Sequence, residues 1–298
     1  MTRPVVAIVD AYSTARYFAP LFTERGYSCV HVQSTRQIPA VYARSFQTGQ
    51  FAAHLVHDRD MPATVAALAG HRPVAVLAGI ESGVELADQL SQALGLRSNG
   101  TEHSAARRDK VAMAETVRRA GLPVAGQARC RDRDELLAWY EAAGGGLVVV
   151  KPVKSAGNDG VFFCADEKEV LAAGDALLGT DSALGLRNEA VLAQEYLLGV
   201  EHYVNTVSLD GVHYVTDVHS TRHLTVNGVR DLLGGSHLLP RRGPAQDPLV
   251  AYTLGVLDAL GVRHGPAHTE LKLTADGPRL VETAARICGA DLPVLVGA

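Results

Sequence analysis

The chain has 298 residues, of which 47% are hydrophobic and 20% are charged, with a net charge of −4 at pH 7 and a pI near 6.3. These values are typical of a globular protein with a substantial core, and the length suffices for about two domains of 100 to 200 residues each. The acidic balance disfavours a nucleic-acid partner, which would need a strongly basic surface, and no apolar run approaches the roughly 18 residues of a membrane span.

The four cysteines are far apart in the sequence and form no C-x-x-C pair. They therefore indicate neither a zinc site nor a disulfide framework, and they are typical of small apolar side chains in a reducing compartment. The apolar run at residues 5–9 is too short for the core of a signal peptide. We therefore expect a cytoplasmic protein without membrane contact.

The first hundred residues alternate short apolar runs with helical stretches. The runs have the composition of buried parallel strands, and this βαβ order predicts a doubly wound α/β sheet with a crevice at the carboxyl ends of its strands. Asp10-Ala11-Tyr12-Ser13 follows the first strand in place of the fingerprint G-x-G-x-x-G, which disfavours a nicotinamide enzyme. The predicted strands are 5–10, 29–32, 53–57 and 74–79, and the predicted helices are 15–25, 62–69 and 84–94.

From residue 107 the pattern changes to that of an α+β body. Helices are predicted at 107–119, 132–143, 167–178 and 249–260, and strands at 147–150, 161–164, 190–194, 202–209 and 212–219. We expect three units, with a Rossmann-like domain at residues 1–105, a first body subdomain at 106–195 and a second at 196–298.

A glycine-bearing turn follows the apolar strand that ends in Lys151. The turn K-S-A-G-N-D-G runs from Lys154 to Gly160 and leads at once into another strand. Such a turn can lay backbone N–H groups on phosphate oxygens while lysines supply charge. It is not a Walker loop, which ends in G-K-[ST] and precedes a helix. A plain hairpin turn explains the glycines equally well, and Lys110 on an earlier helix is also explained as an exposed lysine.

The segment Gln194-Glu195-Tyr196-Leu197 ends a further strand and precedes Glu201. Backbone groups at such a strand end can pair with an adenine edge, and a carboxylate just beyond can accept hydrogen bonds from ribose. Neither feature is specific in isolation.

Two acids, Glu270 and Glu282, lie on a predicted β-hairpin with strands at 269–274 and 279–283 and a turn at 276–278. A turn centred on Asp276 places them directly opposite, where like charges require a cation, and Mg²⁺ with one or two carboxylates and phosphate oxygens is the usual arrangement. The alternative is a solvated hairpin with two surface glutamates. A one-residue shift or a bulge would put the acids on opposite faces.

Two further charged residues lie at strand ends. Arg286 follows Glu282 by four residues and could bind a carboxylate or acyl phosphate with both arms of its guanidinium. Glu81 faces the predicted crevice of the first sheet and could bind a substrate amine. A surface ion pair for Arg286 and a helix N-terminal acid for Glu81 are the plain alternatives.

Several histidines lie near these residues. His268 shares the strand face of Glu270, where it either supports the site or is a structural histidine. His219, His223 and His237 are spaced too loosely for zinc but could touch a substrate.

The order of these motifs resembles the ATP-grasp superfamily over residues 110–298. The resemblance rests on Lys110, V-V-V-K-P-V with S-A-G-N-D-G, Q-E-Y-L-x-G-x-E, T-E-L-K-L and L-V-E-T-A-A-R in sequence. Within the superfamily, G-P-A-H-T-E-L-K-L, E-T-A-A-R and the segment G-I-E-S-G-V-E-L-A-D at 79–88 look most like L-amino-acid ligases, which join two amino acids at the expense of ATP.

The resemblance implies a set of residue roles. Lys110 and Lys151 would contact ATP phosphates beneath a mobile loop at 155–160, and Glu270 and Glu282 would ligate Mg²⁺, with Mn²⁺ as an alternative. The nucleotide residues would be Lys110, Lys151, Ser155, Ala156, Gly157, Gly160, Glu195, Leu197 and Glu201; the catalytic ones Arg286, Lys151 and His268; and the substrate ones Glu81 and Arg286.

The resemblance predicts an ATP-dependent carboxylate–amine ligase that couples amino acids through an acyl phosphate. The alternatives are a carboxylase-like or purine-type ligase with another acceptor, and a non-catalytic ATP-binding fragment. Ala284 stands where many relatives have a third metal ligand, Asn, and only 16 residues follow Glu282, so we expect a truncated body. The partners would be small molecules, and a homodimer is left open.

Overall fold

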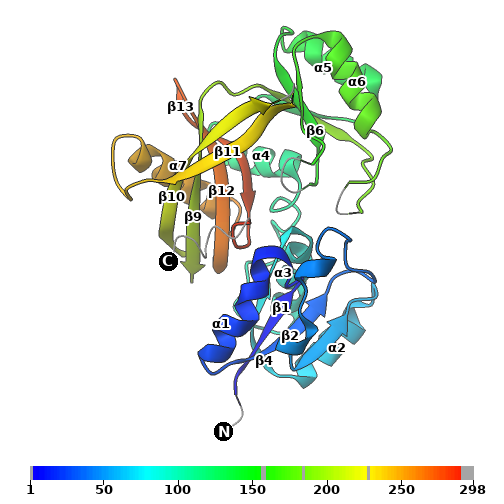
Figure 1. The fold of residues 1–298 in the computed structure, drawn as a ribbon, viewed down its shortest axis with the longest axis vertical. Coiled ribbons are helices and arrows are strands. Elements are labelled where there is room, and N and C mark those ends of the chain that lie inside the picture. The colour runs from blue at the N-terminus through cyan, green and yellow to red at the C-terminus, as the bar shows by residue number, and fades with distance from the viewer. Residues whose placement is uncertain (1–2, 156–158, 183–184, 227–228, 290–298) are drawn as a thin grey trace.

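The computed structural model describes residues 3–155, 159–182, 185–226 and 229–289. We call residues 3–105 the head and residues 106–289 the body; Figure 1 shows the head below the two sheets of the body. Among the described residues, no helix has both the length and the apolar character to cross a membrane.

The head contains the predicted doubly wound sheet. Its four parallel strands lie in the order β3-β2-β1-β4. Strands β2 and β3 are added on one side of β1 and β4 on the other, so the order of the strands reverses between β1 and β4. In doubly wound sheets, ligands bind at the strand carboxyl ends next to such a change of direction. The strands are β1 (Val5–Val9), β2 (Ser28–Gln33), β3 (Ala53–Val56) and β4 (Pro73–Ala78), and the helices are α1 (Phe18–Glu24), α2 (Met61–Gly70) and α3 (Val84–Ala93).

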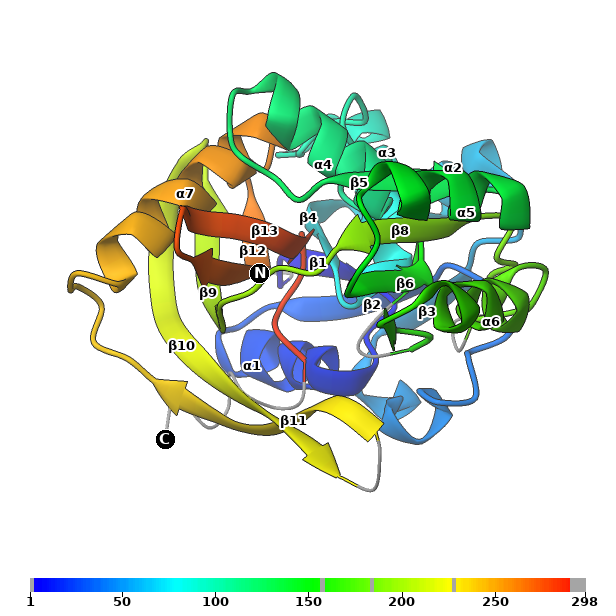
Figure 2. The same ribbon diagram turned by 90° about the horizontal axis from the view of Figure 1, so that it is seen from above.

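The first body sheet is antiparallel, in the order β5-β8-β6-β7. Helices α5 (Arg133–Ala142) and α6 (Glu167–Leu177) lie side by side on its outer face (Figure 2). The strands are β5 (Gln127–Cys130), β6 (Val148–Pro152), β7 (Phe162–Cys164) and β8 (Val191–Glu195), and α4 (Lys110–Arg119) precedes them. Strand β5 was not predicted, because its four residues Q-A-R-C are half polar and too few to show a period.

The second body sheet is also antiparallel, in the order β11-β10-β9-β12-β13, with α7 (Gln246–Ala259) packed on one face. Its strands are β9 (Val200–Leu209), β10 (Val212–Val226), β11 (Val229–Leu238), β12 (Gly265–Thr274) and β13 (Gly277–Ala284). The prediction for β10 ended seven residues early and β11 was missed. The end of β10 is rich in polar residues and β11 contains a glycine pair, and Thr221, His223 and Leu233 of these strands line a cavity rather than a core.

The β12–β13 hairpin brings Glu270 opposite Glu282, as predicted, but by another route. Thr274 pairs with Gly277, so the turn is Ala275-Asp276 and is not centred on Asp276. A bulge at Val281 then shifts the register by one residue between the Leu271–Leu280 pair and the glutamate pair. The turn alone would not have set these acids opposite each other; the bulge does.

Candidate active site

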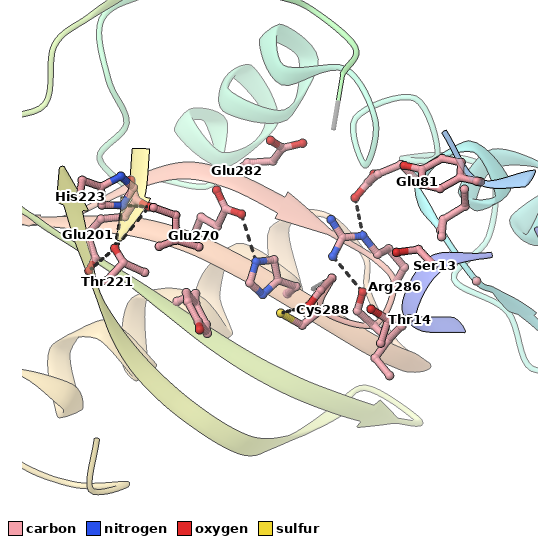
Figure 3. Close-up of a pocket in the computed structure, with 18 residues that line it drawn as sticks. Ser13, Thr14, Glu81, Glu201, Thr221, His223, Glu270, Glu282, Arg286 and Cys288 are labelled. Carbon is pink, nitrogen blue, oxygen red and sulfur yellow. Dashed lines mark hydrogen bonds and ion pairs between the residues drawn. The ribbon is translucent and has the colours of Figure 1, made fainter. Parts of the chain in front are cut away.

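Two cavities meet at one group of acidic residues. The larger, of about 450 Å³, lies between the head and the second body sheet, and the smaller, of about 90 Å³, lies between the two body sheets. Figure 3 shows the larger one, with Glu81 and Arg286 at one end and Glu201 at the other. The two cavities share Glu201, His223, Glu270 and Glu282.

The smaller cavity gathers most of the residues expected to bind a nucleotide. Its lining includes Lys110, Lys151, Ser155, Glu195, Leu197 and Glu201. Gly160 does not line it; a Cβ there would approach Leu177 and Pro152 to 2.8 and 2.9 Å, so this glycine serves a tight turn with φ of +70°. Ala156 and Gly157 lie outside the described residues.

Two buried lysines point into the smaller cavity. Lys110 Nζ lies 3.0 Å from Glu282 Oε1 and 3.4 Å from Ser155 Oγ, so it is not the exposed helix lysine of the plain alternative. Burial and the Lys110 charge lower the pKa of Lys151 to about 8, although Glu282 and Glu270 oppose the shift. Two ammonium groups beside a cavity make a site for a polyanion such as a chain of phosphates.

Glu270 and Glu282 project from paired positions of adjacent strands (Figure 3). Burial alone would raise the pKa of Glu270, but His268, Arg286 and Lys110 outweigh it and lower the pKa to about 2. Oε1 of Glu270 faces His268 and Oε1 of Glu282 faces Lys110. The second oxygen of each carboxylate has no donor among the described residues, so both remain available to a ligand.

These two free oxygens could hold a divalent cation. No group of three or more His, Cys, Asp or Glu side chains within the described ranges is placed to hold a metal ion. Mg²⁺ is commonly bound by one or two carboxylates while phosphates and water complete its shell. Two carboxylates beside a cavity lined by two lysines could meet that requirement.

His268 is held between two acceptors. Its Nδ1 lies 2.7 Å from Asn205 Oδ1 and its Nε2 lies 3.1 Å from Glu270 Oε1. Asn205 must present its oxygen, because its Nδ2 donates to Asp217. Burial would lower the pKa of His268, but hydrogen bonds to Cys288 and Glu270 raise it to about 9. His268 is therefore an imidazolium that fixes one oxygen of Glu270.

Glu81 lies at the start of the short 3₁₀ helix Glu81–Gly83 that follows β4. Its Oε1 accepts from Arg286 Nε at 2.6 Å and its Oε2 accepts from Arg108 Nη1. Burial favours a raised pKa, but the two arginines dominate and lower it, so Glu81 is ionised. Arg108 was missed in the sequence, where the pair Arg107-Arg108 carries no motif.

The remaining candidates lie on strands β9, β10 and β11 of the second body sheet. Glu201 accepts from His223 Nε2 at 3.0 Å, and His223 lines both cavities. His219 stacks on the Tyr203 ring with centroids 4.6 Å apart. His237 is exposed and lines neither cavity.

Comparisons with known proteins agree with this geometry. The chain is 36% identical over 297 residues to dapdiamide A synthase of Enterobacter agglomerans, which covers 99% of the chain and 70% of that protein. No family model matches the chain.

Solved structures share the fold. The L-amino acid ligase of Bacillus licheniformis superposes with a TM-score of 0.72 at 18% identity, covering 97% of the chain and 68% of the ligase. An ADP complex of N5-carboxyaminoimidazole ribonucleotide synthetase gives 0.73 at 20% identity, covering 97% and 73%.

Proposed function

This chain belongs to the ATP-grasp ligases, which form C–N bonds, and from that premise we propose that it couples one amino acid to the amine of another with ATP as the energy source. The main support for this proposal is that the two cavities meet at Glu270 and Glu282. ATP in the smaller cavity would direct its terminal phosphate toward these acids, and the two amino acids would occupy the larger one.

The chemistry requires an activated carboxylate. A carboxylate oxygen attacks the γ-phosphorus, ADP leaves, and an acyl phosphate forms; the amine nitrogen then attacks the acyl carbon, phosphate leaves, and the nitrogen loses a proton. Lys110 and Lys151 would offset charge on the transferring phosphoryl group, and Arg286 would hold the carboxylate. Glu270 and Glu282 would hold Mg²⁺, with Mn²⁺ as an alternative, and the ion would neutralise phosphate charge. Closure of the cavity would exclude water, which competes with the amine.

The test measures ADP release across a panel of amino acids, supplied singly and in pairs. We expect release that depends on a pair and needs a divalent ion. Release with bicarbonate alone would contradict an amino-acid acceptor, and Mg-ATP binding without any release would favour a non-catalytic nucleotide-binding module.

A substitution of Glu282 tests the metal assignment. Glu282→Gln should lower turnover by at least about a hundredfold, the order of loss when one electrostatic contact to a transition state is removed. Glu102→Gln is the matched control, because Glu102 is 88% exposed and lies outside both cavities. Full activity of Glu282→Gln, with its thermal unfolding unchanged, would refute the assignment.

A further inference from the structure

Three charged side chains from distant parts of the sequence form one buried cluster at the end of the larger cavity. Glu81 comes from the head, Arg108 from the segment before α4, and Arg286 from just after β13. Their side chains are 3%, 4% and 15% exposed. Removal of one partner from a buried ion pair leaves the other charge unpaired and destabilises the protein. We therefore expect a substitution of any one of the three residues to disturb the other two.

The guanidinium of Arg286 is fixed along two of its edges. Its Nε donates to Glu81 Oε1 at 2.6 Å and its Nη1 donates to the Ile287 carbonyl at 2.8 Å. Nη2 has no acceptor among the described residues, and Arg286 lines the larger cavity. The hydrogen bonds of Nε and Nη1 therefore fix the direction in which Nη2 points, and Nη2 is available to a ligand.

Arg108 contacts Glu81 from the side that faces away from the cavities. It lines neither cavity, so a ligand in them does not touch it. Its Nη1 donates to Glu81 Oε2, the oxygen that Arg286 does not use. Without Arg108, that oxygen would be buried with no donor, and Glu81 could turn to present both oxygens to Arg286.

The backbone that carries Glu81 is also tightly held. Ser82 donates from Oγ to Asp10 Oδ2 at 2.5 Å, and Asp10 in turn accepts from the backbone N–H of Ser34 at 2.8 Å. Asp10 has a φ of +56°, a strained value for a residue with a side chain, and such strain persists where surroundings enforce it. The ends of β1, β2 and β4 thus fix the base of Glu81, and Arg108 fixes its tip.

We propose that Arg108 is a positioning residue for the ligase reaction, which acts through Glu81 to hold Arg286 in the orientation that meets the substrate carboxylate. The inference rests on the proposed function. It gives the head a part in the chemical step, because Glu81 belongs to the head while Arg286 belongs to the body.

The kinetic test compares Arg108→Met, Arg108→Lys and Arg97→Met. A misplacement of about 1 Å can cost a hundredfold, so Arg108→Met should lower kcat about 10- to 100-fold and leave the Kd for Mg-ATP, measured by calorimetry, unchanged. Arg108→Lys should recover part of kcat, because it restores one cationic donor. Arg97→Met is the control, since Arg97 also joins the head to the body, at 3.2 Å from Asp210, but on the exposed surface.

The outcomes are distinct. Wild-type kcat in Arg108→Met, or equal losses of kcat in Arg97→Met, would overturn the proposal, as would a loss of Mg-ATP binding that parallels the loss of kcat. If the wild-type protein releases no ADP with any amino acid, the proposed function fails first.

Thermal unfolding tests, without any substrate, whether Arg108 and Arg286 are coupled through Glu81. Because Arg108 and Arg286 share Glu81, the shifts in Tm caused by Arg108→Met and Arg286→Met should be non-additive in the double variant. Additive shifts would show that Arg108 does not act on Arg286, and would reject the inference.

Discussion

Lys151 is a buried cation whose pKa, about 8, lies close to physiological pH. It is therefore largely protonated at pH 7 and largely neutral at pH 9 when no nucleotide is bound. Phosphate oxygens favour the ammonium form, so the binding of Mg-ATP requires the proton to be present. The affinity for Mg-ATP should be constant below about pH 7 and fall by up to about tenfold per pH unit above pH 8.

Calorimetry between pH 6.5 and 9.5 checks this dependence on Lys151. Lys151→Arg is the matched control, because a guanidinium stays charged throughout this range. A flat profile in the wild-type protein, or the same slope in Lys151→Arg, would show that Lys151 does not contact the nucleotide phosphates.

The sequence could predict which residues belong to the site where a motif contains them. It could not predict which residues they contact. The order of the motifs along the chain, and the ATP-grasp resemblance that it carries, indicated Lys110, Lys151, Glu270 and Glu282. The contact between Lys110 and Glu282 joins residues that are 172 positions apart, and no local pattern contains it. Arg108 was missed for the same reason, because its partner Glu81 lies in the head and the pairing depends on how the two parts dock.

The end of β4 shows how one element places Glu81, which was predicted to bind substrate. Gly79 directly follows β4, and its N–H donates to the Val9 carbonyl at 2.7 Å. A Cβ at this position would overlap the carbonyl oxygen of Asp10 and lie 3.0 Å from the Ala15 Cβ. Since these atoms belong to the backbone and to a buried alanine, the turn that leads to Glu81 must shift to admit a side chain.

Gly79→Ala should therefore lower the free energy of unfolding by about 1 to 3 kcal/mol, the range for overpacking, and lower kcat by displacing Glu81. Gly70→Ala is the control, because a Cβ at Gly70 in α2 meets nothing within 4 Å and alanine favours a helix by up to about 1 kcal/mol. Chemical denaturation measures both variants. Equal stability of the two would show that the β4 turn tolerates a side chain.

Strand β1 was predicted from a continuous apolar run, because both of its faces pack on core, whereas β12 was predicted from alternation. Strand β11 could not be found this way, because V-R-D-L-L-G-G-S-H-L contains a glycine pair and no alternation. The register of the β12–β13 hairpin illustrates a further limit. A bulge at Val281 depends on what each face of the strand contacts, so turn chemistry alone gave the right pairing of the glutamates for the wrong reason.

The head and body share one hydrophobic cluster rather than touching only at the active site. Val84 of α3 belongs to the same buried cluster as Leu257 of α7 and Leu271 of β12. Arg107 lies beside this junction and is fully buried. Its Nε and Nη2 donate to Asp88 in the head at 3.1 and 2.9 Å, while its Nη1 donates to the Leu260 carbonyl in the body at 2.7 Å. The sequence predicted an α/β head followed by an α+β body. How the two parts pack together depends on the contacts of Arg107 with Asp88 and the Leu260 carbonyl, which the sequence did not reveal.

Because Arg107 binds both parts, its loss should destabilise the whole chain rather than one domain. Arg107→Met leaves Asp88 buried without its partner and should lower the free energy of unfolding by about 3 to 5 kcal/mol, whereas Arg97→Met, which breaks an exposed pair between the same parts, should cost less than about 1 kcal/mol. We expect urea denaturation of the wild-type protein to show a single transition by fluorescence and by circular dichroism. Separate transitions, or equal losses in the two variants, would show that the head and body unfold independently and that Arg107 does not join them.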